Sequence, residues 1–111
     1  MCRYQTLFYD DVKGYIIHCH ECNTIQLAFG NVLLTLYRED FYGLQHCINR
    51  LAEDCRGYEN CPNKCIVVPT PCEGIKFLVS SRELLQLREM MDTAETELRS
   101  LELMKLFDDA R

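Results

Sequence analysis

The sequence predicts an α+β fold in which a mostly antiparallel sheet of five or six strands carries two helices on one face. Short runs of apolar and aromatic residues within 4–37 and 64–79 have the length and composition of strands. After each group of strands, apolar residues recur every three or four positions, which is the period of an amphipathic helix. The expected order is therefore four strands, a helix, two strands and a second helix.

Stretches of turn-forming residues separate the expected strands. Asp10–Gly14 is rich in such residues, and Gly30-Asn31 between two apolar runs is a strong signal for a two-residue hairpin turn. We expect a positive φ at Asn31, which Val would not tolerate, and a central position for both strands beside this turn. The expected strands cover residues 4–9, 15–19, 24–29, 32–37, 64–70 and 75–79.

Two helices are expected from periodicity and from the residues that begin them. The first runs from Glu39 to near Asp54, and its apolar positions follow at spacings of 3, 4 and 3. The second follows the segment 80–83, Ser-Ser-Arg-Glu, which has the spacing of a capping box, and extends to about Asp108. The stripe of the first helix consists of Phe41, Leu44, Ile48 and Leu51.

The chain is expected to be a single domain, 1–111, because its length is close to the commonest domain size. It divides into a first half 1–54, a loop 55–64 and a second half 65–111 that ends in an extended helix. The two halves match at a constant offset of 43 residues. Either a tandem ββα duplication or a chance agreement between two ββα units would explain this. Matched positions include Asn31 with Gly74, Leu36 with Val79, and Phe41 with Leu84.

Composition and charge exclude several classes of partner. The formal net charge is −5, and no cluster of Lys and Arg is present, so we expect no nucleic acid partner. No apolar run approaches the ~18 residues of a membrane span, and the N-terminus does not resemble a signal peptide. We therefore expect no membrane contact and a cytoplasmic location, where thiols stay reduced. The eight cysteines then favour a metal site or incidental thiols over disulfides.

The most specific chemical signal is the pair Cys19 and Cys22, followed directly by Asn23. In a metal knuckle two cysteines bracket a tight turn, and the next residue often needs a left-handed backbone, which Asn tolerates well. Cys61 and Cys65 form a second close pair at the equivalent point of the second half. We expect these four thiolates to hold a structural zinc ion. The alternative is four incidental thiols, because the spacer between the pairs exceeds the usual ~15–20 residues.

Catalytic signals are weak. His18 and His20 flank Cys19 and could replace a thiolate ligand, but ordinary strand or turn roles are more common. No phosphate-binding glycine loop, GxSxG elbow or HExxH motif occurs. The sequence therefore favours a small non-enzymatic interaction or regulatory domain without catalytic residues. The alternative is a thiol-based redox enzyme or redox sensor that uses Cys19 and Cys22, although a strand follows this pair where such sites need a helix N-terminus.

The second helix carries a heptad pattern that predicts association. Its apolar positions step by 3, 4, 3, 4 and 3, and the helix is much longer than its counterpart in the first half. We expect its last turns to overhang the sheet, which would expose Leu98, Leu101, Met104 and Phe107 and favour a homodimer through this helix or binding of another protein. The alternative is that the helix folds back over its own domain. The heptad positions are Leu84, Leu87, Met91, Ala94, Leu98 and Leu101.

The chain also resembles a family of small uncharacterised bacterial proteins of unknown function. The resemblance rests on Cys19-His-Glu-Cys22, on the segment IQLAFGNVLLTL that begins at Ile25, and on IKFLVSSRELLQLREMMDTA in the second half. It covers residues 15 to about 107. It implies a bacterial cytoplasmic protein and supplies no catalytic residues.

Overall fold

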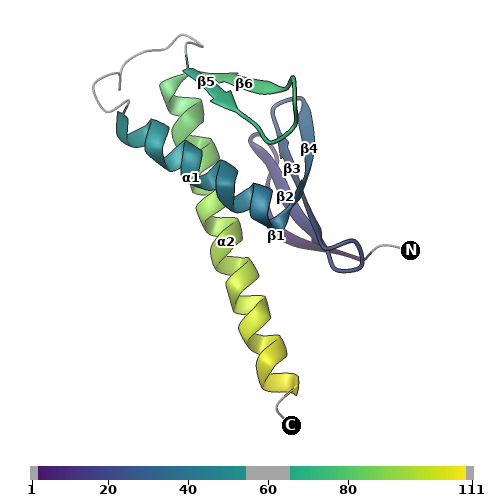
Figure 1. Ribbon diagram of the computed structural model, residues 1–111. Coiled ribbons are helices and arrows are strands. Elements are labelled where there is room, and N and C mark those ends of the chain that lie inside the picture. The colour runs from purple at the N-terminus through teal and green to yellow at the C-terminus, as the bar shows by residue number, and fades with distance from the viewer. Residues whose placement is uncertain (1–2, 55–65, 110–111) are drawn as a thin grey trace.

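The computed structural model describes residues 3–54 and 66–109, and its elements follow the expected order (Figure 1). The fold is α+β, as predicted. The elements are β1 (Tyr4–Asp10), β2 (Gly14–Cys19), β3 (Thr24–Phe29), β4 (Val32–Tyr37), α1 (Arg38–Asp54), β5 (Ile66–Pro69), β6 (Lys76–Val79) and α2 (Ser81–Asp109).

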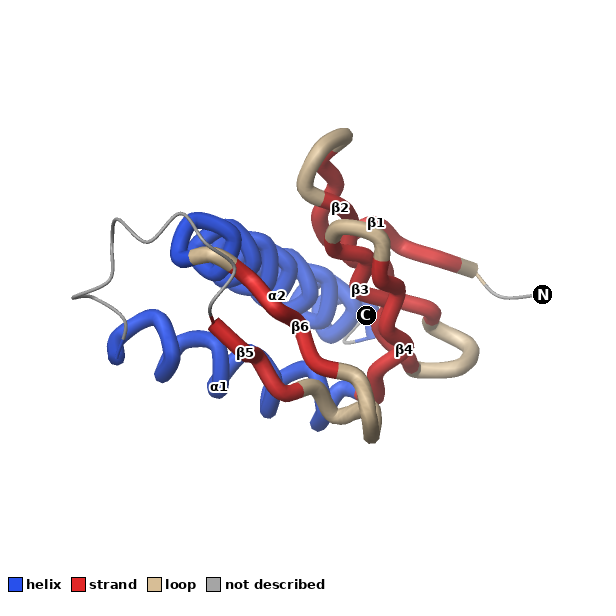
Figure 2. Tube along the Cα trace, turned by 90° about the horizontal axis from the view of Figure 1, so that it is seen from above, coloured by secondary structure: helices blue, strands red, loops and turns tan. Residues whose placement is uncertain are grey.

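The described strands form two sheets, whereas we expected one sheet of five or six strands. β1 to β4 make an antiparallel meander in the order β1-β2-β3-β4, and β5 pairs with β6 in a separate hairpin. This hairpin contacts both helices (Figure 2), and Phe77 meets Phe29 of β3 edge to face with ring centroids 5.9 Å apart. The hairpin is short, and lying on the helices lets it bury Ile66, Val68 and Val79.

Both helices pack on one face of the four-stranded sheet. α1 contacts β3 and β4, while α2 contacts β1 and β2. The register aligns Ile16, Leu27 and Leu34 across three strands, and all three are buried. Their neighbours along the strands, such as Ile17 and Gln26, lie on the opposite face and are more exposed. The largest fully buried side chains on the helices are Phe41, Leu44, Ile48, Leu84, Leu87, Met90 and Met91.

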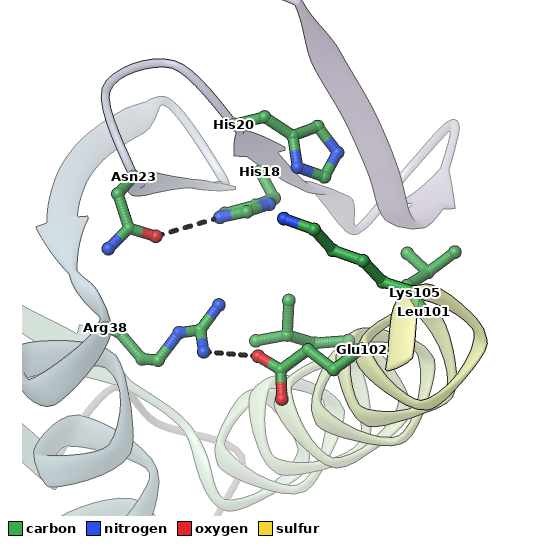
Figure 3. A pocket seen from close by; sticks show the side chains of 8 residues that line it. His18, His20, Asn23, Arg38, Leu101, Glu102 and Lys105 are labelled. Atoms are coloured by element: carbon green, nitrogen blue, oxygen red, sulfur yellow. Dashed lines mark hydrogen bonds and ion pairs between the residues drawn. The ribbon is translucent and has the colours of Figure 1, made fainter. Parts of the chain in front are cut away.

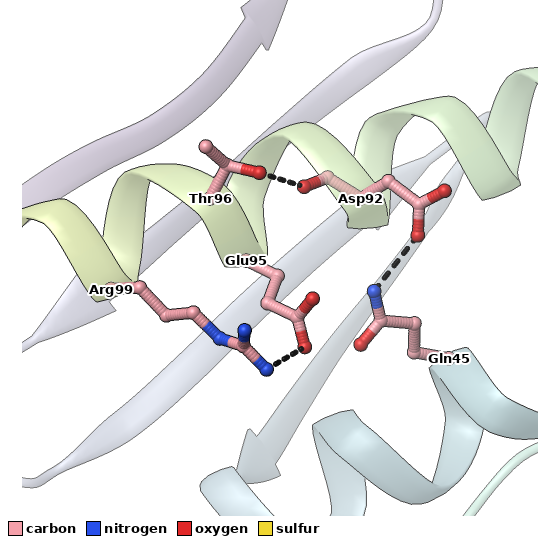
Figure 4. Close-up of polar contacts among 5 residues, drawn as sticks. All are labelled: Gln45, Asp92, Glu95, Thr96 and Arg99. Atoms are coloured by element: carbon pink, nitrogen blue, oxygen red, sulfur yellow. Dashed lines mark hydrogen bonds and ion pairs between the residues drawn. The ribbon is translucent and has the colours of Figure 1, made fainter.

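A polar bridge also joins α1 to α2 (Figure 4). Gln45, which is 8% exposed, donates from Nε2 to Oδ1 of Asp92 at 2.8 Å. On α2 itself, the Thr96 hydroxyl donates to the Asp92 carbonyl at 3.0 Å, and Arg99 pairs with Glu95 at 3.5 Å. Because a buried amide needs a partner, the Gln45–Asp92 bond favours one alignment of the two helices.

The central hairpin confirms the two-residue turn but corrects two details. Phe29 pairs with Val32, so Gly30 and Asn31 form the turn. The positive φ, +62°, belongs to Gly30 and not to Asn31. This matches a type II′ turn, whose first central position takes Gly because Gly has no Cβ. Among the described strands, β4 lies at a sheet edge and is not central.

Two further local predictions are confirmed. In the β1–β2 turn, Oδ1 of Asp10 accepts the backbone N–H groups of Val12 and Lys13 at 2.9 Å each. These bonds, led by the one from Lys13, lower the pKa of Asp10. At the start of α2, the Ser80 N–H donates to Oε1 of Glu83 at 3.0 Å, and the Glu83 N–H donates to the Ser80 hydroxyl at 3.2 Å. This reciprocal pair is a capping box.

The heptad stripe of α2 packs inside its own domain, which corrects part of the predicted overhang. The stripe is buried from Leu84 to Leu98, and Leu101 is half-buried, because α1 and the sheet cover this side of the helix. The expected exposure of Leu98 and Leu101 is therefore wrong. Met104 and Phe107 are exposed, as expected.

The match between the two halves holds for the helices and fails for the hairpins. α1 begins at Arg38 and α2 begins at Ser81, which is the predicted offset of 43 residues. The turn between β3 and β4 has two residues, however, whereas residues 70–75 separate β5 from β6. The tandem duplication stays a prediction.

Candidate functional site

The turn between β2 and β3 carries the first cysteine pair. The Cys22 backbone N–H donates to Sγ of Cys19 at 3.4 Å, and Asn23 has a φ of 54°. Cys19 is buried and Cys22 is exposed. The left-handed backbone predicted after the second cysteine is therefore confirmed at Asn23.

The second cysteine pair, Cys61 and Cys65, lies outside the described residues, as does Cys55. The four-thiolate zinc site therefore stays a prediction. Within 3–54 and 66–109, no group of three or more His, Cys, Asp or Glu residues is placed to hold a metal ion. Of the other described cysteines, Cys47 is half-buried on α1, and Cys72 packs against the core from the turn after β5.

A pocket of about 160 Å³ opens next to the cysteine turn, where the end of β2 faces α1 and α2 (Figure 3). Its walls come from three parts of the chain that are far apart in the sequence. Hydrophobic side chains of α2 cover one side, and polar side chains cover the others. The lining residues are His18, His20, Asn23, Arg38, Leu98, Leu101, Glu102 and Lys105.

His18 is the most buried polar residue of this pocket, at 5% exposure. Its Nε2 lies 3.4 Å from Oδ1 of Asn23, and its ring meets that of His20 edge to face with centroids 4.7 Å apart. Burial is the main cause that lowers the pKa of His18, helped by the charges of His20 and Arg38 and opposed by the Asn23 contact. Because Nε2 donates its hydrogen to Asn23, Nδ1 is left as a buried acceptor without a hydrogen-bond partner.

An ion pair between Arg38 and Glu102 closes the pocket between α1 and α2. The Nε of Arg38 is also buried without a partner. An unsatisfied buried polar group costs about 1–3 kcal/mol unless water or a ligand meets it. Lys105 extends from α2 toward the side of the pocket that carries the histidines (Figure 3). With Arg38 and Lys105 against Glu102, the fixed charges of the lining sum to about +1.

Sequence reasoning missed Arg38, Glu102 and Lys105, and for His18 and His20 it weighed metal ligation against ordinary strand or turn roles without predicting this pocket. One signal was available for Arg38. It is the first residue of α1, a place where the helix dipole favours acidic side chains such as Glu39. A cation there indicates a partner elsewhere, which the structure identifies as Glu102.

The C-terminal end of α2 forms a second candidate surface, which we call the helix-end patch. It consists of Leu103, Met104, Leu106 and Phe107, which are 57%, 61%, 65% and 75% exposed. Leu103, Leu106 and Phe107 have the spacing of residues that share one side of a helix. This end of α2 extends past the rest of the domain (Figure 1). No helix among residues 3–54 and 66–109 has the length and apolar character that a membrane crossing needs.

Comparison with known proteins gave one match. A family model described as a family of unknown function (DUF6686) covers residues 1–108. A search of curated proteins and a search of solved structures gave no match. The resemblance to a family without a known activity is thus confirmed, while the bacterial source and the cytoplasmic location stay predictions. Because the model covers nearly the whole sequence, the chain belongs to DUF6686, a family of unknown function.

Proposed function

We propose that this chain is a small non-enzymatic interaction domain that forms a homodimer through the C-terminal end of α2. The helix-end patch is the observation that carries this proposal. Four large apolar side chains are more than half exposed over one and a half turns of helix. The stripe of α2 that builds the core already ends near Leu101. Contiguous exposed apolar side chains of this kind commonly mark an interaction surface.

The charge of the helix end favours a second copy as the partner. Residues 99–111 hold three basic and three acidic residues, so this segment is neutral although the whole chain carries −5. Two helix ends can therefore approach without the repulsion that the remainder of the chain would cause. A neutral segment also offers little attraction to the phosphates of nucleic acid or to anionic lipid. A twofold pairing of the same patch on both copies is the simplest closed arrangement.

The size of the patch sets the expected strength of the dimer. A standard stable interface buries about 800 Å² on each partner. The helix-end patch contains four large side chains on one short helical segment, which is less than such an interface requires. We therefore expect a concentration-dependent dimer with a dissociation constant on the order of 10 μM.

Sedimentation velocity over a range of concentrations tests this proposal. The wild-type chain should shift from monomer to dimer as its concentration rises. The double variant Leu103→Ser with Phe107→Ser should stay monomeric, and it should fold normally because both side chains are exposed. Leu85→Ser is the matched control, since Leu85 lies on the same helix and is 53% exposed but is outside the patch. A wild-type chain that stays monomeric at about 200 μM, well above the expected dissociation constant, would contradict the proposal.

We further propose that a structural zinc ion stabilises this domain through Cys19, Cys22, Cys61 and Cys65. The backbone of the Cys19–Cys22 turn supports this, because it combines an N–H···Sγ bond at 3.4 Å with a left-handed residue after the second cysteine. Four thiolates leave no open position for water or substrate, so the role would be structural. Metal binding would then add directly to folding stability.

Metal content measured on protein purified without added metal tests the zinc site. We expect about one zinc per chain, and we expect both a chelator and Cys22→Ser to lower the melting temperature. Cys72→Ala, which alters a thiol outside the proposed set, should not change the metal content. Thiol titration separates the redox alternative. Metal-bound thiols become reactive after chelation, whereas a low-pKa redox pair reacts at once and without a chelator.

A further inference from the structure

We infer that the pocket between β2, α1 and α2 is a binding site for a small 2-hydroxy monocarboxylate. This site is separate from the proposed dimer surface. Its residues on α2 are Leu98, Leu101, Glu102 and Lys105, and their spacing places them together on one side of the helix. The helix-end patch lies mainly on the other side.

Two buried polar atoms of the lining residues have neither a hydrogen bond nor an ion pair, and they point to a ligand. The His18 side chain lines the pocket and is only 5% exposed, and its Nδ1 is buried without a hydrogen-bond partner. The Nε of Arg38 is buried without a partner in the same pocket. Native structures rarely leave such groups unsatisfied. One is an acceptor in the tautomer that Asn23 selects, and the other is a donor. The matching ligand therefore presents both a hydroxyl donor and an acceptor oxygen.

The charges of the lining specify the anionic part of the ligand. Arg38 is paired with Glu102, which leaves Lys105 as the cation that the ligand would neutralise. One excess positive charge suits a monoanion such as a carboxylate, whereas a dianionic phosphate would meet repulsion from Glu102. A carboxylate in this pocket would accept from Nζ of Lys105 and from Nε of Arg38.

The volume of the pocket and its apolar wall indicate the size of the ligand and the nature of its uncharged part. A volume of about 160 Å³ corresponds to roughly five water molecules, so the pocket suits a ligand of about six non-hydrogen atoms. Leu98 and Leu101 are the hydrophobic residues of the lining and suit a methyl group. Lactate combines a carboxylate, a 2-hydroxyl and one methyl within this size, so it is the probe that the pocket specifies.

Nuclear magnetic resonance of the full chain tests the site at constant ionic strength. L-lactate and D-lactate are each titrated while the ring signals of His18 are followed. We expect a saturable shift with at least one of them and a dissociation constant on the order of 1 mM. Propionate has the same carboxylate and methyl group but lacks the hydroxyl. It should bind about tenfold more weakly if His18 Nδ1 accepts from the ligand.

Lys105→Met should weaken the binding of lactate by about tenfold, and it should not disturb folding because Lys105 is exposed. Lys13→Met is the matched control, since Lys13 pairs with Glu89 away from the pocket and should leave binding unchanged. The proposal is overturned if neither lactate shifts His18 at about 100 mM, or if Lys105→Met binds as the wild type does. Equal binding of propionate would overturn the 2-hydroxyl assignment, and tighter binding of inorganic phosphate would overturn the monocarboxylate assignment.

Discussion

Gly14 should be the least replaceable of the glycines at the turns of the four-stranded sheet. It has a φ of +136° and pairs with Phe29 where β2 and β3 run side by side. A Cβ at this position would lie 1.9 Å from the carbonyl oxygen of Ala28 and 2.9 Å from its carbonyl carbon. Both atoms belong to backbone, so the clash cannot be relieved by rotating a side chain. Gly14→Ala must therefore displace one strand from the other.

The cost can be estimated against Gly30→Ala, which changes a glycine at the neighbouring turn. Gly30 has a φ of +62°, and an added Cβ would have no atom within 4 Å. Its replacement should cost only the left-handed strain of about 1–2 kcal/mol. Gly14→Ala adds the backbone displacement to a strain of about 1–3 kcal/mol, so we expect about 3–5 kcal/mol in total. That is a large part of the 5–15 kcal/mol that typically stabilises a domain.

Urea unfolding followed by circular dichroism measures both variants. With a urea dependence of about 1–3 kcal/mol per molar, Gly14→Ala should lower the midpoint by roughly 1–5 M, and at the same slope Gly30→Ala should lower it by less than half as much, about 0.3–2 M. Equal losses for the two variants would refute the claim that close approach of the Ala28 carbonyl makes Gly14 special. Such a result would mean that both substitutions cost only the free energy of placing Ala at a positive φ.

The remaining predictions concern three turns and caps. Ser80→Ala should lower the free energy of unfolding by about 1 kcal/mol in urea titrations, because it removes the cap of α2. Asn31→Val should cost less than Gly30→Val by the same measurement, since the positive φ lies at residue 30. The pKa of Asp10 is lowered in the folded chain, so the stabilisation from its carboxylate is present above the ordinary value of 3.8 and is lost as the pH falls through the lowered value. The stability difference between wild type and Asp10→Ala should therefore shrink between about pH 6 and about pH 2 in thermal melts.

The sequence located the secondary structure well because its signals are local. Alternation, helical spacing and the residues of turns identified all eight described elements in the right order. The pairing of β5 could not be predicted in this way. The alternating pattern that includes Ile66 and Val68 fits a strand of a larger sheet and a strand of a separate hairpin on the helices equally well. The heptad stripe was ambiguous for the same reason. Leu98 has the spacing of an intermolecular seam, and the structure shows that the same spacing packs within the domain.

The same distinction explains which parts of the candidate site could be predicted. Residues that are adjacent in the sequence could be recognised together, whereas residues that meet only in the folded chain could not. The cysteine turn was visible in the sequence, because Cys19, Cys22 and Asn23 are adjacent and the required backbone at Asn23 depends on its own residue type. The pocket was not visible, because Arg38 and Glu102 come from opposite halves of the chain and meet only after α1 and α2 cross. No spacing rule connects two such positions.

The last turns of α2 hold both proposed surfaces, and their physical requirements differ. The segment beyond Leu101 has little cover from the sheet, and Leu, Met and Lys residues there are strong helix formers. The ion pair from Glu102 to Arg38 ties this segment to the start of α1, and it also forms a wall of the pocket. A change on the pocket side, such as Lys105→Met, should therefore alter ligand binding and leave dimerisation intact. A change on the patch side, such as Phe107→Ser, should do the reverse, so the two proposals can fail independently.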